Sequence, residues 1–222
     1  MVNNKHAFWI ALIFTIAIFG IGLVIGYFFE GYMTGKANSM LVQSEINLLD
    51  EQIRDSAIYS FGINCSDATE SLFNFADKIY SEAYQLEEWD KQAKFTSELT
   101  LLHQKYDLLR IMLWEEGISI KERCGNDSFH TVVYFFNYDP EQKDVQISAR
   151  QKTYERILDE IKANYADKIL LIPVAGNLGL ESVNLIMKKY SVSELPSVIV
   201  DENSTKIATG EVTTTQIKNI IF

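Results

Sequence analysis

The sequence predicts an α/β protein held in a membrane by one amino-terminal helix. An uncharged apolar segment lies near the amino terminus, apolar residues recur at helical spacing in the middle, and strand-like and helix-like segments alternate in the last third. The chain has 222 residues, of which 47% are hydrophobic and only 3 are proline. We therefore expect it to fold along nearly its whole length. We divide it into a tail, a transmembrane helix, a helical stalk, a helical hairpin and an α/β domain, at residues 1–6, 7–29, 30–62, 63–126 and 127–222.

The segment AFWIALIFTIAIFGIGLVIGYFF, residues 7–29, carries no charge and predicts a transmembrane helix. About 20 apolar residues are enough to cross a bilayer, so this segment makes the lipid bilayer one partner. The alternative is a cleaved signal peptide, whose apolar region is typically about 7–15 residues and ends at a small-x-small site. This segment is longer, and no Ala-x-Ala follows it.

The charges beside this segment predict its orientation. Lys5 precedes it, whereas Glu30 is the first charge after it and Lys36 the next. Because the more positive flank stays in the cytoplasm, we expect a single-pass signal-anchor in the cell membrane with its amino terminus inside. The rest of the chain then faces the periplasm, the lumen or the extracellular space.

The part of the chain from Glu30 onward holds all 30 acidic residues and 19 of the 20 basic ones, and its net charge of −11 disfavours nucleic acid and anionic lipid surfaces as partners. Solubility alone is an alternative reason for this acidity. Within the predicted span, Gly22 and Gly26 have the small-xxx-small spacing that packs two transmembrane helices together. Glycine is common in spans, so this spacing is only a candidate homodimer contact.

The predicted stalk has an apolar stripe over residues 39–60. Val42, Ile46, Leu49 and Ile53 follow one another at 4-3-4 spacing, which is typical of an amphipathic helix or a coiled coil.

Two further helices predict a hairpin. In CSDATE, Asp67 and Glu70 resemble a capping box at the start of one helix. The other helix is predicted at residues 88–116, with Gly117 as its carboxy-terminal cap. Its apolar residues keep an unbroken 4-3-4-3-4 spacing: Phe95, Leu99, Leu102, Tyr106, Leu109 and Leu113.

The short connection near QLEEWD makes this hairpin antiparallel, so its far ends are neighbours. Cys65 and Cys124 lie at those ends, and we predict a disulfide that contributes about 4 kcal/mol in the chain-entropy model. An oxidising location on the outer side allows such a bond. The alternative is two unrelated buried thiols. A redox-active pair is disfavoured because catalytic pairs are usually close in sequence.

Three N-x-S/T sequons, Asn64, Asn126 and Asn203, lie on the predicted outer side. They are candidate glycosylation sites if the host glycosylates proteins. One or two such sequons would also arise by chance in this composition.

From Phe129 onward the pattern changes from helical to extended. The predicted strands are HTVVYFF, KILLIPVAG, PSVIV and KIATG, with a turn at DENST between the last two. The predicted helices are DVQISARQKTYERILDEIKANY, LESVNLIMKKY and TTTQIKNII. The order strand-helix-strand-helix-strand-strand-helix predicts a mixed sheet.

The segment KKYSVSELPSVIVDENSTKIATGEVTTTQIKNII resembles the carboxy-terminal half of a thioredoxin-fold domain. Tyr190 and Val192 stand ahead of the Leu195–Pro196 pair, and the closing hairpin ends at Gly210. The resemblance implies a thioredoxin-like fold for the last domain and a cis peptide bond at Pro196. It also puts the strand with Pro173 at an edge of the sheet, where the missing amide is tolerated.

Thioredoxin-like oxidoreductases carry a Cys-x-x-Cys pair after the first strand of this domain. Here that place is NYDPEQ, which has no cysteine. Asp139 and Glu141 are no thiol nucleophiles and are better explained as residues at a helix start. This departure from the family pattern removes dithiol exchange at that place.

The resemblance implies that the loop before the cis-proline pairs with extended peptide. The candidate peptide-binding residues are Asn137, Tyr138, Asp139, Pro140, Leu195 and Pro196. We therefore expect a redox-inactive binding or assembly module rather than an enzyme, with a protein or peptide as its partner. The alternative is a thiol-disulfide oxidoreductase or folding helper that uses Cys65 and Cys124.

The sequence predicts no metal site and no cofactor. His6, His103 and His130 are scattered, without the spacing of metal ligands. GNLG at residues 176–179 lacks the Lys-Ser/Thr of a phosphate loop and the third glycine of a dinucleotide fingerprint, so we expect a turn there.

Overall fold

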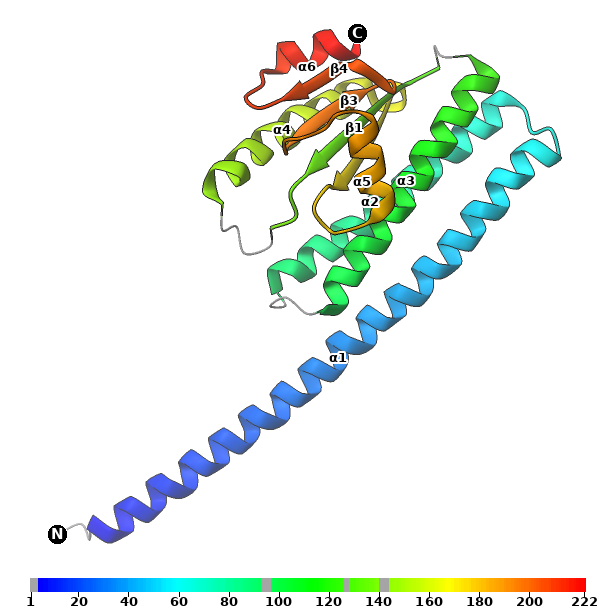
Figure 1. Cartoon of the computed structure of the whole chain (residues 1–222). Coiled ribbons are helices and arrows are strands. Elements are labelled where there is room, and N and C mark those ends of the chain that lie inside the picture. The colour runs from blue at the N-terminus through cyan, green and yellow to red at the C-terminus, as the bar shows by residue number, and fades with distance from the viewer. Residues whose placement is uncertain (1–3, 93–96, 126–127, 140–143) are drawn as a thin grey trace. The chain divides into compact units, whose positions relative to one another are not determined.

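The chain folds into long helices followed by an alternating α/β region (Figure 1). The computed structural model describes residues 4–92, 97–125, 128–139 and 144–222. The elements are α1 (Asn4–Ser60), α2 (Cys65–Gln92), α3 (Ser97–Cys124), β1 (His130–Phe136), α4 (Val145–Tyr165), the 3-10 turn η1 (Ala166–Lys168), β2 (Ile169–Ala175), α5 (Glu181–Lys189), β3 (Ser197–Val200), β4 (Asn203–Thr209) and α6 (Thr214–Ile221).

Two compact units make up the chain, Met1–Glu45 and Ile46–Phe222. The first is the amino-terminal part of α1 and contains Phe8–Phe29, which has a mean hydropathy of 2.7. This segment is long enough and apolar enough to cross a bilayer. The predicted span and stalk belong to one continuous helix rather than to two.

The second unit is built around a mixed four-stranded sheet in the order β2-β1-β3-β4. β1 pairs in parallel with β2 and antiparallel with β3, and β3 pairs antiparallel with β4. The predicted mixed sheet and its order of elements are confirmed. Pro173 lies in β2 at an edge and pairs with Tyr134 of β1 on its inner side.

Helices cover both faces of the sheet (Figure 1). On one face, α4 and α6 bury a cluster that includes Tyr134, Tyr154, Ile161 and Ile217. On the other face, Trp114 of α3 packs edge-on against Phe135, with 6.3 Å between ring centroids. Because neighbouring residues of a strand point to opposite faces, β1 serves both layers and is buried along its middle.

The prediction that α3 ends at Gly117 is wrong. The helix continues to Cys124, and Gly125 follows it with a φ of +99°. A Cβ on Gly117 would lie 3.1 Å from Cδ2 of Leu170. Glycine is needed there because α3 approaches β2 closely, whereas Gly125 has the left-handed backbone of a helix end.

The limits of α2 also differ from the prediction. Asn64, rather than Asp67, is the cap: its Oδ1 accepts the Asp67 amide at 2.9 Å, and its Nδ2 donates to Asp67 Oδ2 at 2.9 Å. The predicted connection at QLEEWD is helical, because α2 continues to Gln92 and buries Leu86.

The turn between β3 and β4 is shorter than predicted. Asp201 and Glu202 have φ of +51° and +54°, and β4 already begins at Asn203. Two left-handed central residues are typical of a type I′ turn, whose twist matches that of the strands.

The end of α1 packs with its polar face. Asn47 and Glu51 are buried, and Asn47 Nδ2 donates to Glu82 Oε1 of α2 at 2.9 Å. The apolar stripe predicted for the stalk stays exposed: Val42, Ile46, Leu49 and Ile53 all keep more than half of their surface. Buried carboxylates and amides hold this part of α1, which the apolar spacing alone did not indicate.

Candidate functional site

The predicted peptide-binding residues meet where β1 ends and β3 begins. Phe135 pairs with Ser197 in the antiparallel ladder. Continuing this register puts Pro196 beside Phe136 and Leu195 beside Asn137. The Leu195–Pro196 peptide bond is cis, and the Pro196 side chain is buried while that of Leu195 is half-buried. Pro140 lies outside the described residues.

Three elements hold the loop after β1 in place. The Asn137 amide donates to Gln151 Oε1 of α4 at 2.8 Å. The Tyr138 amide donates to Asn177 Oδ1 at 2.7 Å, and Asn177 Nδ2 donates back to the Tyr138 carbonyl at 2.9 Å. The Tyr138 ring also lies 4.2 Å from that of His103 on α3. This paired bonding fixes the backbone of the loop against the turn after β2.

A cavity of about 300 Å³ opens at the same end of the sheet. It is lined by α4 and by the segment between β4 and α6: Ala149, Arg150, Thr153, Tyr154, Gly210, Glu211 and Val212. Arg150 Nη1 lies 2.6 Å from Glu194 Oε1, so an ion pair connects the cavity to the loop that carries Leu195.

Tyr154 is the buried polar group of this cavity. Only 1% of its surface is exposed, and its hydroxyl has no hydrogen-bond partner among the described residues. Burial raises the pKa of Tyr154 to about 12, so the hydroxyl stays protonated and can donate. The sequence did not indicate Tyr154 as a site residue, because helical spacing cannot show that a tyrosine hydroxyl reaches a cavity.

No thiol lies at the start of α4 among the described residues. Asp144 caps this helix, accepting the amides of Gln146 and Ile147 at 3.0 Å each. Asp139 supports the cap by accepting the Asp144 amide at 3.3 Å. The helix-start role expected for Asp139 fits this bond, while Glu141 lies outside the described residues.

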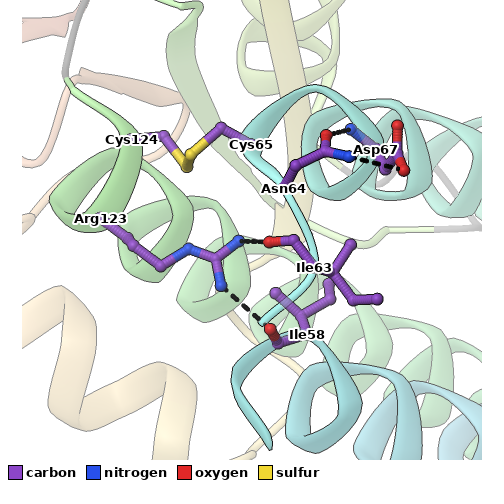
Figure 2. The surroundings of a disulfide bond; sticks show 7 residues. All are labelled: Ile58, Ile63, Asn64, Cys65, Asp67, Arg123 and Cys124. Atoms are coloured by element: carbon purple, nitrogen blue, oxygen red, sulfur yellow. Dashed lines mark hydrogen bonds between the residues drawn. A yellow bond between two sulfur atoms is a disulfide. The ribbon is translucent and has the colours of Figure 1, made fainter. Parts of the chain in front are cut away.

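The two cysteines form a disulfide, with their Cα atoms 5.7 Å apart (Figure 2). It joins the first residue of α2 to the last residue of α3. Arg123 reinforces this corner: Nη1 donates to the Ile58 carbonyl at 3.0 Å and Nη2 to the Ile63 carbonyl at 2.9 Å. The disulfide precedes the start of β1, whereas the candidate site follows its end.

The candidate glycosylation sites differ in their surroundings. Asn64 and Asn203 are exposed, and the Asn64 side chain is occupied in capping α2 (Figure 2). Asn126 lies outside the described residues.

The histidines have structural contacts. The His103 ring contacts the Tyr138 ring at a tilt of 44°, and His130 Nδ1 lies 2.8 Å from Asp201 Oδ2. The side chain of His6 is outside the described part. Within the described residues, no group of three or more His, Cys, Asp or Glu could hold a metal ion.

The GNLG segment lies between β2 and α5. Its Asn177 holds Tyr138, and the Leu178 carbonyl accepts Gln104 Nε2 at 2.8 Å. The segment thus joins the candidate site to α3.

Comparison of the chain with protein-family models, with curated proteins and with solved structures finds no match.

Proposed function

We propose that this protein is a membrane-anchored binding module with a thioredoxin-like domain and no dithiol chemistry. The sheet order β2-β1-β3-β4, the parallel β1–β2 pair and the antiparallel β3 and β4 support the thioredoxin-like assignment. β2 also occupies the edge that the resemblance implies for the strand with Pro173.

The positions of the sulfur atoms support a binding role over catalysis. Both cysteines are in the disulfide, and the described residues at the start of α4 include none. An insulin-reduction assay tests this choice. Turnover that a Cys124→Ser change abolishes would replace the binding module with the thiol-disulfide enzyme.

The proposed partner is an extended peptide at the end of the sheet. The observation that carries this proposal is the buried Tyr154 hydroxyl, which lacks a partner in a cavity connected by Arg150 to the Glu194–Pro196 loop. A peptide carbonyl could accept from Tyr154. Buried polar groups normally have such a partner, so an arriving acceptor would be stabilised there.

We propose that the amino terminus is cytoplasmic and that the compact unit Ile46–Phe222 faces outward. The apolar helix Phe8–Phe29 supports the anchor, and a disulfide is chemically stable in an oxidising compartment. Protease protection in sealed membranes tests the orientation. A compact unit that resists protease from outside and becomes sensitive only after the membrane is opened would contradict it.

Photo-crosslinking in the native membrane tests the peptide site. A photoreactive residue at Leu195 should capture more client protein than one at Leu185, which is a leucine of α5 with 59% of its surface exposed. Equal capture from the two positions would refute the site, because Leu185 reports chance encounters.

Self-association is a second candidate role. Ile46, Leu49 and Ile53 are exposed at the 3-4 spacing of a coiled-coil seam, and β-branched residues alternating with leucine favour two parallel strands. Gly22 and Gly26 are a further candidate contact within the span. A Leu49→Glu change should then reduce crosslinked dimers in membranes, whereas Leu101→Glu, at an exposed leucine of α3, should not. Equal dimer yields from both variants would argue against this seam.

A further inference from the structure

A second, larger cavity of about 570 Å³ lies along the outer edge of β2. Residues from α2, α3, β1, α4 and β2 line it, and none of them belongs to the cavity beside Tyr154. Its walls are largely apolar and aromatic, formed by Ala83, Tyr84, Phe136, Leu158, Leu171 and Pro173. A volume of this size fits the range of small-molecule sites in proteins.

The edge of β2 beside this cavity is closed to a further strand. The Ala175 amide donates to Asp107 Oδ2 at 3.1 Å, and Lys162 Nζ donates to the Ile169 carbonyl at 2.9 Å. Pro173 has no amide to offer. An extended peptide therefore cannot add to the sheet here, and the cavity suits a compact ligand.

Two buried donors line this cavity. Arg110 is 7% exposed, and its Nη1 donates to Asp107 Oδ1 at 3.0 Å while its Nε has no partner among the described residues. The buried Tyr80 hydroxyl also makes no hydrogen bond of good geometry, although the Leu171 amide faces it. Arginine has donors only, so a ligand that satisfies both groups must bring an acceptor oxygen.

Three carboxylates from α2 and α4 also line the cavity: Glu87, Glu155 and Asp159. Within the described part of the chain, none of them makes an ion pair. Burial raises the pKa of Glu155, and the charges of Glu87 and Asp159 add to this effect while Lys152 opposes it. Burial likewise raises the pKa of Asp159. A cationic group on a ligand would relieve this repulsion.

Among the described residues that line this cavity, the one lysine is already engaged. Lys162 Nζ donates to the carbonyls of Ala166 and Ile169, at 3.0 Å and 2.9 Å. Burial lowers the pKa of Lys162, and Asp77 and Asp167 oppose that shift. Lys162 therefore closes the end of β2 rather than neutralising the three carboxylates.

We propose that this cavity binds a small molecule with an ammonium group beside an acceptor oxygen. A free amino acid and the amino-terminal residue of a peptide share this chemistry. The acceptor oxygen of the ligand accepts hydrogen bonds from Arg110 and Tyr80. Its ammonium group faces the carboxylates of Glu87, Glu155 and Asp159. An apolar side chain of the ligand packs against Leu158, Phe136 and Pro173.

Calorimetric titration of the full chain in detergent micelles tests this proposal with three probes. L-leucine and the dipeptide Leu-Gly carry both groups, whereas isoamylamine keeps the ammonium group and loses the oxygen. Binding of leucine indicates a free amino acid, and binding of Leu-Gly alone indicates a peptide terminus. The proposal is overturned if neither binds, or if isoamylamine binds as tightly as they do.

A Tyr80→Phe variant separates binding from folding. Because the hydroxyl makes no hydrogen bond of good geometry with the protein, its loss should change the melting temperature little. The same change should lower the affinity for the probe roughly fivefold, which is the effect of one lost hydrogen bond. Tyr59→Phe, at an exposed tyrosine of α1, is the matched control and should bind normally. If Tyr80→Phe and the unaltered protein bind the probe with equal affinity, the proposed hydrogen bond from Tyr80 to the ligand oxygen is overturned.

A Glu155→Gln variant tests the ammonium contact. It should lower the affinity for leucine or Leu-Gly several-fold, whereas Glu122→Gln, at an exposed carboxylate of α3, should not. Unchanged affinity in Glu155→Gln would remove the cationic part of the ligand from the proposal.

Discussion

Two ionic clusters on α3 differ in how their carboxyl groups are stabilised. The Glu116 cluster joins α1 to α3 and consists of Glu51, Arg54 and Glu116. The Asp201 cluster joins α3 to the β3–β4 turn and consists of Lys121, His130, Asp201 and Glu202. Each cluster includes one buried side chain of α3, Glu116 or Lys121, but acid and base affect the two clusters in opposite directions.

The Glu116 cluster has more carboxylates than cations. Arg54 contacts both Glu51 and Glu116, and its Nη1 also donates to Ser71 Oγ at 2.8 Å. Burial, a hydrogen bond with Glu51 and the charges of Glu51 and Asp55 raise the pKa of Glu116 to about 9, although Arg54 opposes this. The raised pKa favours the protonated form of Glu116, which can donate a hydrogen bond to Glu51.

In the Asp201 cluster, the Asp201 carboxylate accepts from several donors. Burial alone would raise the pKa of Asp201, but hydrogen bonds from His130, Lys121 and the Thr131 amide outweigh it and lower that pKa. Lys121 Nζ lies 2.9 Å from Asp201 Oδ1. The neighbouring Glu202 accepts Trp114 Nε1 at 2.7 Å, so both turn residues bind α3. The ratio of donors to carboxylates, rather than burial alone, sets the direction of the pKa.

Removing the arginine should have the largest effect. An Arg54→Met change leaves Glu51 and Glu116 buried without a cation, and should lower the free energy of unfolding by about 3–5 kcal/mol. Urea denaturation followed by circular dichroism measures this. Arg156→Met, at an exposed arginine of α4, should cost less than about 0.5 kcal/mol. A loss no larger than that of the control would mean that Arg54 does not hold α1.

Removing the lysine should have an intermediate effect. A Lys121→Met change takes a donor from Asp201 and should cost about 1–3 kcal/mol at neutral pH. The depressed pKa of Asp201 contributes stability that is present above the unfolded value of 3.8 and is lost as pH falls through the folded value. The variant should therefore lose less further stability below pH 3.8 than the unaltered protein does. Urea denaturation at several pH values measures both effects, and the exposed Lys78→Met is the control. An unchanged acid response would exclude Lys121 as a stabiliser of the Asp201 anion.

Replacing Glu116 with glutamine should have the smallest effect of the three near pH 5 and should alter mainly the pH dependence of the free energy of unfolding. In the unaltered protein the folded state keeps a proton that the unfolded state loses above about pH 4.5, so this group makes stability fall as pH rises from 4.5 to about 9. A Glu116→Gln change keeps a donor for Glu51 and should flatten that decline. Chemical denaturation between pH 5 and pH 9 measures the slope, with the exposed Glu122→Gln as control. If stability falls with pH equally steeply in Glu116→Gln and Glu122→Gln, the proton is held by a group other than Glu116.

Periodicity predicted the elements because it reports which face of a segment is apolar. It indicated the helices and the order of helices and strands along the chain. Pro173 indicated which strand lies at an edge of the sheet. Periodicity could not show which face of α1 packs, because Asn47 and Glu51 are buried only through partners on later helices. For the same reason Gly117 was interpreted as a cap rather than as a close approach to Leu170.

Some residues of the candidate site could likewise be predicted from the sequence and others could not. Leu195, Pro196 and the loop after β1 were identified by resemblance, since a short motif carries them. Tyr154 and Arg150 were not, because no local pattern distinguishes a tyrosine that lines a cavity from one in the core. Tyr80 and Arg110 of the second cavity are likewise isolated residues on separate helices, and only the tertiary fold brings them together.

The Cys65–Cys124 bond encloses the whole of α2 and α3 in one covalent ring. A single proteolytic cut anywhere inside that ring would leave the two pieces attached, so the nicked protein would keep its mass on a non-reducing gel. The fragment beyond the cut would stay tethered to the amino-terminal helix until a reductant released it.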